Sequence, residues 1–261
     1  MTGATGTLGR AVVPRLRADR YEVRGTSRRA TSGSGVEWVV ADLGTGAGVD
    51  QAVAGVDAVV HLASATTQYR RAGDVDVAGT RRLVEASARA GVRHVVYVSI
   101  VGIDKVPLGY YRHKLAAERV VRKAAVPWSI LRATQFPQLL DERLLPAASV
   151  LGVVLGDDGV TIQPVDPRDV ADRLADLLKA GPTQSVEDFG GPEILRYDDV
   201  VRPWLRARGK RRRVLRLRFP GGIARAMRAG ALTTTARPTG TRTWQDYLAE
   251  RYGTGMVDQL S

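Results

Sequence analysis

Apolar residues along the chain form short blocks whose spacing alternates between that of strands and that of helices. Compact apolar runs predict strands at Tyr21–Thr26, Val36–Val40, Asp57–Leu62, His94–Ser99 and Trp128–Leu131. Apolar residues three and four positions apart predict helices at Thr7–Arg20, Val49–Ala54, Asp74–Ala90, Leu108–Ala125 and Asp169–Ala180. Strands that alternate with helices pair in parallel through right-handed crossovers. We therefore expect an α/β fold with a doubly wound parallel sheet of the Rossmann type.

The pattern changes in the last part of the chain. Broken helical spacing is expected first over Gln138–Leu151, and later helices at Asp198–Arg208, Gly222–Ala231 and Thr243–Arg251. Apolar and basic residues alternate over Val214–Phe219, which predicts a half-exposed strand. We expect residues 1–185 to form the Rossmann domain and residues 186–261 to form a small α/β lobe of the same domain over its substrate side.

Positive charge is concentrated in one segment. The chain of 261 residues carries a formal net charge of +12, yet no Asp or Glu stands between Val201 and Trp244. The 13 basic residues there account for more than that net charge: Arg202, Arg206, Arg208, Lys210, Arg211, Arg212, Arg213, Arg216, Arg218, Arg225, Arg228, Arg237 and Arg242. A solvated face or a funnel for acidic substrates is expected here. Nucleic-acid binding by residues 202–218 is not favoured, because no interleaved aromatic residues accompany them.

Other features of the composition narrow the class of protein. The absence of cysteine excludes disulfides, thiolate nucleophiles and cysteine-based zinc sites. His61 and His94 occupy strand positions and are expected in the core, so no metal site is expected. No apolar run approaches the roughly 20 residues of a membrane span, and no signal peptide is recognised. We expect a cytoplasmic protein without a membrane partner.

A glycine-rich stretch begins the chain. Residues Thr2, Gly3, Ala4, Thr5, Gly6, Thr7, Leu8 and Gly9 place three glycines at a spacing of three, just before a predicted helix. Glycines allow a tight turn, and the helix N-terminus offers unpaired N–H groups to a phosphate. Such a turn normally follows a buried strand, but only Met1 precedes it. The first strand is therefore expected to be missing, because the gene start was assigned too late or the chain was trimmed.

Residues after the next two strands bear on a dinucleotide. Arg28 and Arg29 follow the strand where an acidic residue would bind the ribose of NAD, whereas arginine accommodates the 2′-phosphate of NADP. NADP is therefore favoured over NAD. Asp42 and Leu43 stand where an adenine edge would lie, and Asp42 is either an acceptor for the adenine amine or a helix cap.

A tyrosine and a lysine carry the candidate chemistry. Tyr110 and Lys114 are four apart on a predicted helix and share one face. An ammonium beside a phenol lowers the pKa of the tyrosine, which then serves as a proton donor or acceptor near neutral pH. The strand before this helix ends at Ser99. Tyr111 points off the shared face and is expected to pack at a lid or pocket.

These residues, together with Ala63 and Ser64, resemble the short-chain dehydrogenase/reductases. The runs that carry the resemblance to the atypical, NmrA-like branch are Tyr110–Glu118, Pro127–Phe136, Gln163–Asp166 and Gly240–Trp244. The resemblance implies NADP binding and hydride transfer with Tyr110 as acid/base and Ser99 and Lys114 as its catalytic partners. It places Ala63, Ser64 and Lys114 at the cofactor, and Tyr111, Thr134, Gln135 and Phe136 at the substrate.

The sequence departs from the family at two positions near this site. Ile100 stands where many extended members have a Ser or Thr that polarises the substrate carbonyl, and Asp76 stands in place of a helix asparagine. We expect an NADP-dependent oxidoreductase acting on a small carbonyl, alcohol or enone. The alternative is an NmrA-like sensor that binds a dinucleotide and a protein partner without turnover, which the two departures favour. Asp166 and Asp169 are expected to form a helix cap and a surface ion pair.

Overall fold

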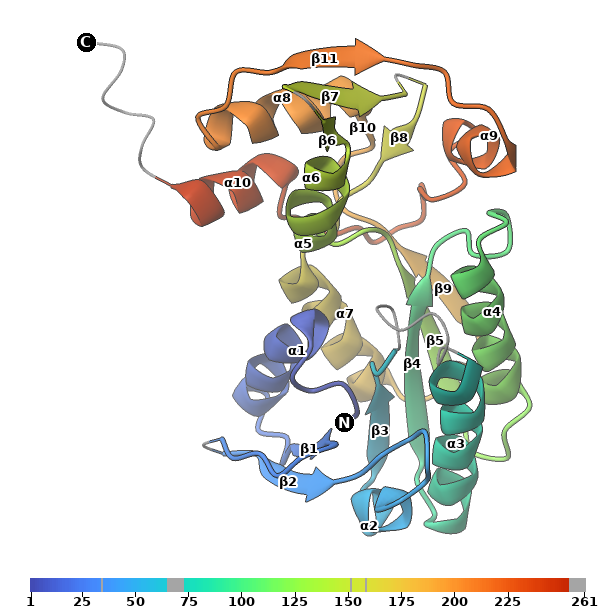
Figure 1. Cartoon of the computed structure of the whole chain (residues 1–261). Coiled ribbons are helices and arrows are strands. Elements are labelled where there is room, and N and C mark those ends of the chain that lie inside the picture. The colour runs from blue at the N-terminus through green and yellow to red at the C-terminus, as the bar shows by residue number, and fades with distance from the viewer. Residues whose placement is uncertain (34, 65–72, 151, 158, 254–261) are drawn as a thin grey trace.

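The computed structural model of the chain describes residues 1–33, 35–64, 73–150, 152–157 and 159–253, with the backbone alone at 73–75. Its centre is a parallel sheet in the order β3 (Ala58–His61), β4 (His94–Ile100), β5 (Trp128–Ala133) and β9 (Val186–Phe189). Helices cover both faces of this sheet (Figure 1). The predicted doubly wound α/β fold is confirmed.

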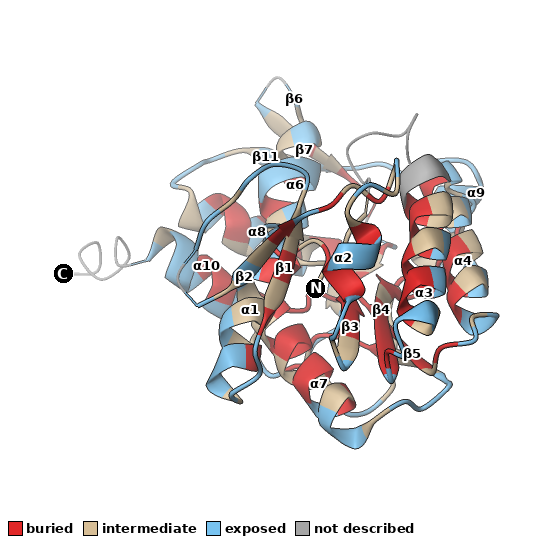
Figure 2. Ribbon diagram, turned by 90° about the horizontal axis from the view of Figure 1, so that it is seen from below, coloured by how far each residue is buried: buried red, intermediate tan, exposed pale blue. Residues whose placement is uncertain are grey.

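Two helix layers bury the two faces of the sheet. The helices α1 (Thr7–Ala18) and α7 (Pro167–Ala180) pack on one face, and α2 (Val49–Val53), η2 (Gly73–Gly79), α3 (Thr80–Arg89) and α4 (Gly109–Arg122) lie toward the other. Alternation along β4 explains the division. Val96 belongs to the core beside α1 and α7, whereas Val95 and Tyr97 belong to the core beside α3 and α4. Figure 2 shows the buried residues on the helix sides that face the sheet.

The sheet is interrupted between β1 (Arg24–Ser27) and β3, at the position of the strand that was expected to be missing. The strands β1 and β2 (Glu37–Val40) form a separate parallel pair. Among the residues that the structure describes, only Met1 and Thr2 lie between this pair and β3. The Thr2 amide donates to Val60 O at 3.0 Å, and the Thr26 amide donates to Met1 O at 2.9 Å. A bridge of two residues therefore joins the two parts of the sheet and places the glycine turn beside the end of β3.

His61 holds this bridge against the helix layer. Its Nδ1 lies 2.7 Å from the Thr2 hydroxyl and its Nε2 lies 2.9 Å from the Thr80 hydroxyl. Burial, helped by the positive charge of Lys114, lowers the pKa of the imidazole to about 3. His61 is therefore a neutral core residue, as its strand position suggested. His94 is also buried and contacts the Ser129 hydroxyl at 2.9 Å.

The lobe is built from two stretches of chain. The first stretch contains α5 (Pro137–Leu139), η3 (Leu140–Leu144), α6 (Leu145–Ala147), β6 (Ser149–Val150), β7 (Val153–Gly156) and β8 (Thr161–Ile162). The second contains β10 (Leu195–Arg196), α8 (Tyr197–Ala207), β11 (Arg213–Arg216), α9 (Gly222–Arg228) and α10 (Trp244–Tyr252). Leu140, Val154 and Ile162 share one hydrophobic core with α8 and α10.

Two expectations about this region therefore need correction. The strand β9 (Val186–Phe189) lies beyond residue 185 yet pairs with β5 in the main sheet, whereas Leu140, Val154 and Ile162 lie before residue 185 and pack in the lobe. The broken helical stretch expected over residues 138–151 is present as far as Ala147, but Ser149 and Val150 pair with β7 instead, and residue 151 lies outside the described residues. Tertiary pairing, rather than local spacing, decides both boundaries.

A buried carboxylate organises the lobe core. Asp141 accepts hydrogen bonds from Trp204 Nε1 at 2.8 Å, Tyr247 OH at 2.9 Å and Tyr252 OH at 2.6 Å. Arg208 forms an ion pair with the same carboxylate at 3.2 Å. Burial alone would raise the pKa of Asp141, but these donors together lower it. The lobe is therefore cross-linked by one ionised side chain that joins η3, α8 and α10.

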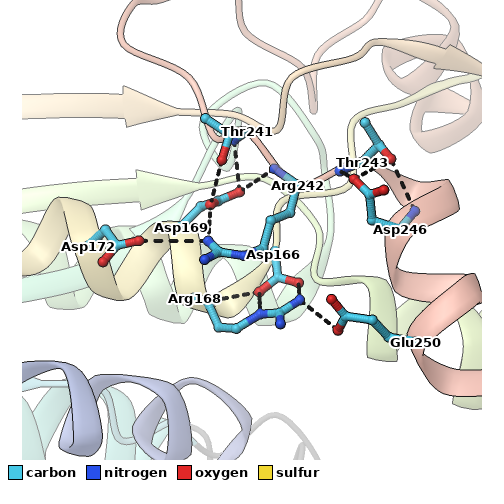
Figure 3. A network of polar contacts seen from close by, with 9 residues as sticks. All are labelled: Asp166, Arg168, Asp169, Asp172, Thr241, Arg242, Thr243, Asp246 and Glu250. Atoms are coloured by element: carbon cyan, nitrogen blue, oxygen red, sulfur yellow. Dashed lines mark hydrogen bonds and ion pairs between the residues drawn. The ribbon is translucent and has the colours of Figure 1, made fainter.

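A second polar network anchors the C-terminal segment on α7 (Figure 3). Asp166 caps α7 by accepting from the Arg168 amide at 2.8 Å and also pairs with the Arg168 guanidinium, as expected. Asp169 accepts from the backbone amides of Thr241 and Arg242 at 2.9 and 3.0 Å, and pairs with the Arg242 guanidinium. This contact fixes the segment that leads into α10 against the Rossmann domain.

Candidate functional site

The glycine turn leaves no room for a side chain at Gly3 or Gly9. Gly3 has φ +68°, and a Cβ on it would lie 2.8 Å from Ala63 N. A Cβ on Gly9 would lie 2.3 Å from Gly3 O, so the turn and the first turn of α1 are in direct backbone contact. Thr5, Gly6 and Thr7 are exposed. The N-cap residue of α1 is Gly6, so no side chain caps the N–H groups at this helix end. The N–H groups at this helix end thus suit a phosphate ligand.

Two arginines stand beyond the end of β1, the strand whose Thr26 amide donates to Met1 O. Arg28 and Arg29 are exposed, and the backbone there is held by a hydrogen bond from the Arg29 amide to Ser27 Oγ at 3.3 Å. The Thr31 hydroxyl donates to the same oxygen at 3.1 Å. Exposed guanidinium groups suit a phosphate that approaches from solvent.

Asp42 orders the turn after β2. Its Oδ1 accepts from the Gly44 amide at 2.8 Å. The alternative role of Asp42 as a helix cap is not seen, because α2 begins seven residues later, at Val49, and its N-cap residue is Gly48. Leu43 is buried, and a Cβ on Gly79 would lie 2.9 Å from Leu43 Cβ. An adenine edge at this position would therefore meet a loop that Asp42 orders and that packs against Gly79.

Tyr110 lies in the first turn of α4 with its hydroxyl 2.5 Å from Ser64 Oγ. Ser64 follows β3 and Ala63, whose amide donates to the Thr2 hydroxyl at 3.2 Å. The candidate acid/base is therefore connected through Ser64 to the loop that packs on the glycine turn. Tyr111 packs instead with Val106 and Leu232 at the edge of the lobe, and its ring centroid is 6.1 Å from that of Tyr110.

Lys114 lies one turn further along α4 and is buried. Its Nζ donates to Val98 O at 2.9 Å and lies 4.3 Å from the centroid of the Tyr97 ring. Burial lowers the pKa of this ammonium to about 8, while the charges of Asp76 and Glu118 oppose the shift. Lys114 is therefore a buried ammonium that contacts β4 and whose pKa lies below that of an exposed lysine.

Two hydroxyls at the ends of β4 and β5 are buried. Ser99 is 3% exposed and Thr134 is 5% exposed. Neither hydroxyl oxygen has a hydrogen-bond partner among the described residues. Ser99 is two residues beyond Tyr97, so alternation places it on the face of the sheet that α4 covers. A buried hydroxyl without a protein partner costs stability unless a ligand or water completes it, which fits a site for a polar substrate.

Two carboxylates act on the Lys114 charge, Asp76 and Glu118, and the sequence had assigned no role to Glu118 or to its partner Arg132. Glu118 and Arg132 form a bidentate ion pair with contacts of 2.9 and 2.8 Å, and Glu118 is 1% exposed. Asp76 in η2 is equally buried. The signal for Glu118 is its spacing, since it stands four residues after Lys114 on the same face of α4. These carboxylates offset the cost of burying a cation in this layer.

The expected substrate residues are divided between two places. Gln135 Nε2 donates to Leu232 O at 2.9 Å, and Gln135 Oε1 accepts from the Gln163 amide at 3.2 Å. Gln135 therefore connects the end of β5 to both stretches of the lobe. Phe136 packs against the core between α1 and α7. No group of three or more His, Cys, Asp or Glu side chains in the described part of the chain could hold a metal ion.

Comparison with known proteins points to one cofactor class. A family model described as NAD(P)H-binding matches residues 3–180. A (4-alkanoyl-5-oxo-2,5-dihydrofuran-3-yl)methyl phosphate reductase of Streptomyces griseus is 34% identical over 204 residues, which cover 75% of this chain and 68% of that protein. In three further curated relatives, the matched residues cover 56%, 34% and 54% of the length of the relative.

Solved structures share the fold at low identity. The NADPH complex of the quinone oxidoreductase QOR2 from Escherichia coli has a TM-score of 0.78 at 21% identity, with 96% of this chain and 98% of that chain covered. A short-chain dehydrogenase/reductase superfamily protein from Agrobacterium tumefaciens with bound NAD has a TM-score of 0.73 at 24% identity, with 96% and 94% covered. The two structures hold different dinucleotides.

Proposed function

Because the chain belongs to the NAD(P)H-binding family, we propose that it is an NADP-dependent oxidoreductase. Its substrate would be a small carbonyl, alcohol or enone. The observation that carries the proposal is the arrangement at the carboxyl end of β4. There, the Tyr110 hydroxyl, the buried Lys114 ammonium and the buried Ser99 hydroxyl all belong to one layer, between the sheet and α4.

The residues would divide the work of binding as follows. The N–H groups at the start of α1 bind the pyrophosphate, with Gly3 and Gly9 allowing its close approach. Arg28 binds the 2′-phosphate of NADP through its guanidinium. Lys114 holds the nicotinamide ribose. A bound reduced nicotinamide would supply the hydride.

Proton movement is assigned to the side chains of this chain. Tyr110 holds a proton on its phenolic oxygen and delivers it to the substrate oxygen, or accepts one in the reverse direction. Ser64 orients the phenol through the 2.5 Å contact. Ser99 donates to the substrate oxygen and gains the hydrogen-bond partner that it otherwise lacks within the described residues. The Lys114 charge favours the phenolate that remains on Tyr110.

The name of the Streptomyces griseus relative favours an enone among the three substrate classes. That protein is a reductase of a 2,5-dihydrofuran whose ring double bond is conjugated with its 4-alkanoyl and 5-oxo groups. For this chain we propose reduction of a conjugated carbonyl compound, in which hydride adds to the β-carbon, Tyr110 protonates the carbonyl oxygen, and the enol that results tautomerises to the saturated carbonyl product. The direction and the class rest on this relative, whereas the roles of Tyr110 and Lys114 rest on the site.

A second candidate is a dinucleotide sensor without turnover. Ile100 in place of a hydroxyl residue and the buried Asp76 favour it, because an anion there cannot donate the hydrogen bonds of an asparagine. In that case the protein would bind NADP and signal to a protein partner. Oxidation of NADPH with a panel of enones and aldehydes, followed at the nicotinamide absorbance band, separates the two candidates. Binding without oxidation across the panel would support the sensor.

The test of the mechanism uses Tyr110→Phe with Tyr111→Phe as the matched control. Tyr110→Phe should abolish turnover and leave NADPH affinity within about twofold of the parent chain, because the phenol transfers the proton but is not assigned to cofactor binding. Tyr111→Phe should retain turnover. Full activity of Tyr110→Phe would contradict the proposal.

Cofactor preference is tested separately with Arg28→Ala. Loss of a charge-assisted contact to the 2′-phosphate should weaken NADPH binding by roughly tenfold to a hundredfold and leave NADH binding unchanged. Equal effects on both dinucleotides would remove the assignment of Arg28. Fluorescence titration of the bound nicotinamide measures both affinities.

A further inference from the structure

The end of the lobe around β11 carries apolar side chains that nothing in the described structure covers. Every residue from 215 to 223 is exposed. The large apolar side chains of this stretch are Leu215 (44% exposed), Leu217 (47%), Phe219 (41%) and Ile223 (38%). Figure 1 shows β11 at the end of the lobe that is farthest from β1 and β2. Exposed apolar side chains gathered in one segment are typical of an interaction surface.

Register shows which face of the lobe sheet is open. Val214 packs into the lobe core, and Arg216 reaches Asp198 on α8 at 2.5 Å, so both point toward α8. Alternation then places Arg213, Leu215 and Leu217 on the opposite face. The Leu217 amide donates to Gly156 O at 2.7 Å, which extends the pairing with β7 as far as this residue.

Neighbouring strands add apolar residues to the same face. Leu215 pairs with Leu155, Arg213 pairs with Val153, and Val153 pairs with Val150. Directly paired residues share a face. The open face therefore consists of Val150, Val153, Leu155, Arg213, Leu215 and Leu217, which we name the β11 face.

Cations border this face without matching acids. A hollow of about 430 Å³ lies between the end of α8 and the start of β11, lined by Arg202, Leu205, Arg206, Lys210, Arg211, Arg212, Arg213 and Val214. Asp198 neutralises Arg202 and Arg216 at the inner side. No ion pair with a carboxylate in the described residues is formed by Arg206, Lys210, Arg211, Arg212 or Arg213. A strong positive potential is therefore combined with an open apolar face.

We propose that the β11 face and the cations around its hollow dock on a membrane surface rich in anionic lipids. Arginine and lysine beside an anionic leaflet each add to the affinity, and the apolar side chains enter the interface. A contact of this kind needs no spanning helix. No helix in the described parts of the chain is long and apolar enough to cross a membrane.

The same observations disfavour two other occupants. A second copy of the chain would bring two such cationic segments together, and their repulsion opposes pairing. A nucleic acid would use the arginines but would find Phe219 as the only aromatic side chain of residues 211–223 for stacking on its bases. The aliphatic β11 face has no use in such a complex.

The test is co-sedimentation of the full chain with phosphatidylcholine vesicles, with and without about 30% phosphatidylglycerol. Binding is expected only with the anionic lipid. Reversing three charges in Arg211→Glu, Arg212→Glu and Arg213→Glu should weaken binding at least about a hundredfold. Replacing two apolar side chains in Leu215→Ser and Leu217→Ser should abolish the part of the binding that survives in high salt.

Matched controls distinguish docking from general charge effects or misfolding. Reversal of three exposed cations on and after α4, in Arg119→Glu, Arg122→Glu and Lys123→Glu, changes the net charge equally and should leave vesicle binding within about threefold of the parent chain. Circular dichroism and the urea midpoint should show that each variant folds.

Several results would overturn the proposal. These are equal loss in the control variant, equal binding to both vesicle types, or no vesicle binding together with tight binding of a duplex DNA probe. Sedimentation velocity measures the oligomeric state of the chain in solution. A dimer in solution that Leu215→Ser and Leu217→Ser dissociate, without vesicle binding by the parent chain, would assign the β11 face to a second copy instead.

Discussion

The proton on Lys114 links the site to the stability of the whole chain. The pKa of Lys114 in the folded protein is about 8, against an ordinary value of 10.5, because the ammonium is buried. The unfolded chain therefore binds more protons than the folded chain between these two pH values, and stability rises with pH across that window. The full difference corresponds to about 3 kcal/mol at 1.36 kcal/mol per pKa unit.

Replacement of Lys114 by methionine should remove this pH dependence. Between about pH 7 and about pH 9.5, the free energy of unfolding of the parent chain should rise by about 2 kcal/mol relative to that of Lys114→Met. The window avoids the carboxylates at acid pH and most of the tyrosine titration at alkaline pH. Urea unfolding followed by tryptophan fluorescence gives the free energy at each pH.

A control at the end of the same helix isolates burial as the cause. Lys123 is exposed at the end of α4, so Lys123→Met should differ from the parent chain by a nearly constant amount across the same window. If the difference between the parent chain and Lys114→Met stays flat within about 0.5 kcal/mol, the buried ammonium does not have the lowered pKa and the reasoning is refuted.

Three further predictions concern the parts that hold the site in place. Gly9→Ala should weaken NADPH binding at least about tenfold in a fluorescence titration, because its Cβ would lie 2.3 Å from Gly3 O. Gly109→Ala is the control and should leave NADPH binding unchanged, because a Cβ there meets only the Arg112 guanidinium within 4 Å. The His61 pKa of about 3 lies below its ordinary 6.5. The free energy of unfolding of the parent chain should therefore fall by about 1.4 kcal/mol per pH unit relative to that of His61→Gln as the pH falls below about 6. A constant difference between the urea unfolding free energies of the two proteins would contradict this. Asp141→Asn should cost about 3 kcal/mol in urea unfolding, because it removes the anion that Arg208 and three hydrogen-bond donors surround.

Local pattern was sufficient for most helices and strands of the Rossmann domain. The helix predicted at Leu108–Ala125 is Gly109–Arg122, and the strand predicted at His94–Ser99 is His94–Ile100. These segments succeed because their apolar spacing already contains the side that must be buried. The strand at Val186–Phe189 was not expected, because two of its four residues are acidic and only pairing with β5 makes it a strand.

The site divides in the same way. The glycine turn, Arg28, Tyr110 and Lys114 are predicted from residue type and spacing, and their roles toward a dinucleotide stay predictions. The contact between Ser64 and Tyr110 joins residues 46 positions apart, and the pair of Glu118 with Arg132 joins a helix to a strand. Spacing along the chain contains no information on such contacts, since crossovers bring the segments together only after the sheet forms.

The sequence by itself determined the fold class and placed the glycine turn, the tyrosine and the lysine of the candidate site, because each depends on residues close together in the chain. Only the tertiary structure decided how two residues, Met1 and Thr2, bridge the two parts of the sheet, and how His61 holds them there. It also decided that the lobe combines residues before and after β9, and that its apolar β11 face stays open. Burial and pairing between distant segments set all of these features, and neither can be read from local periodicity.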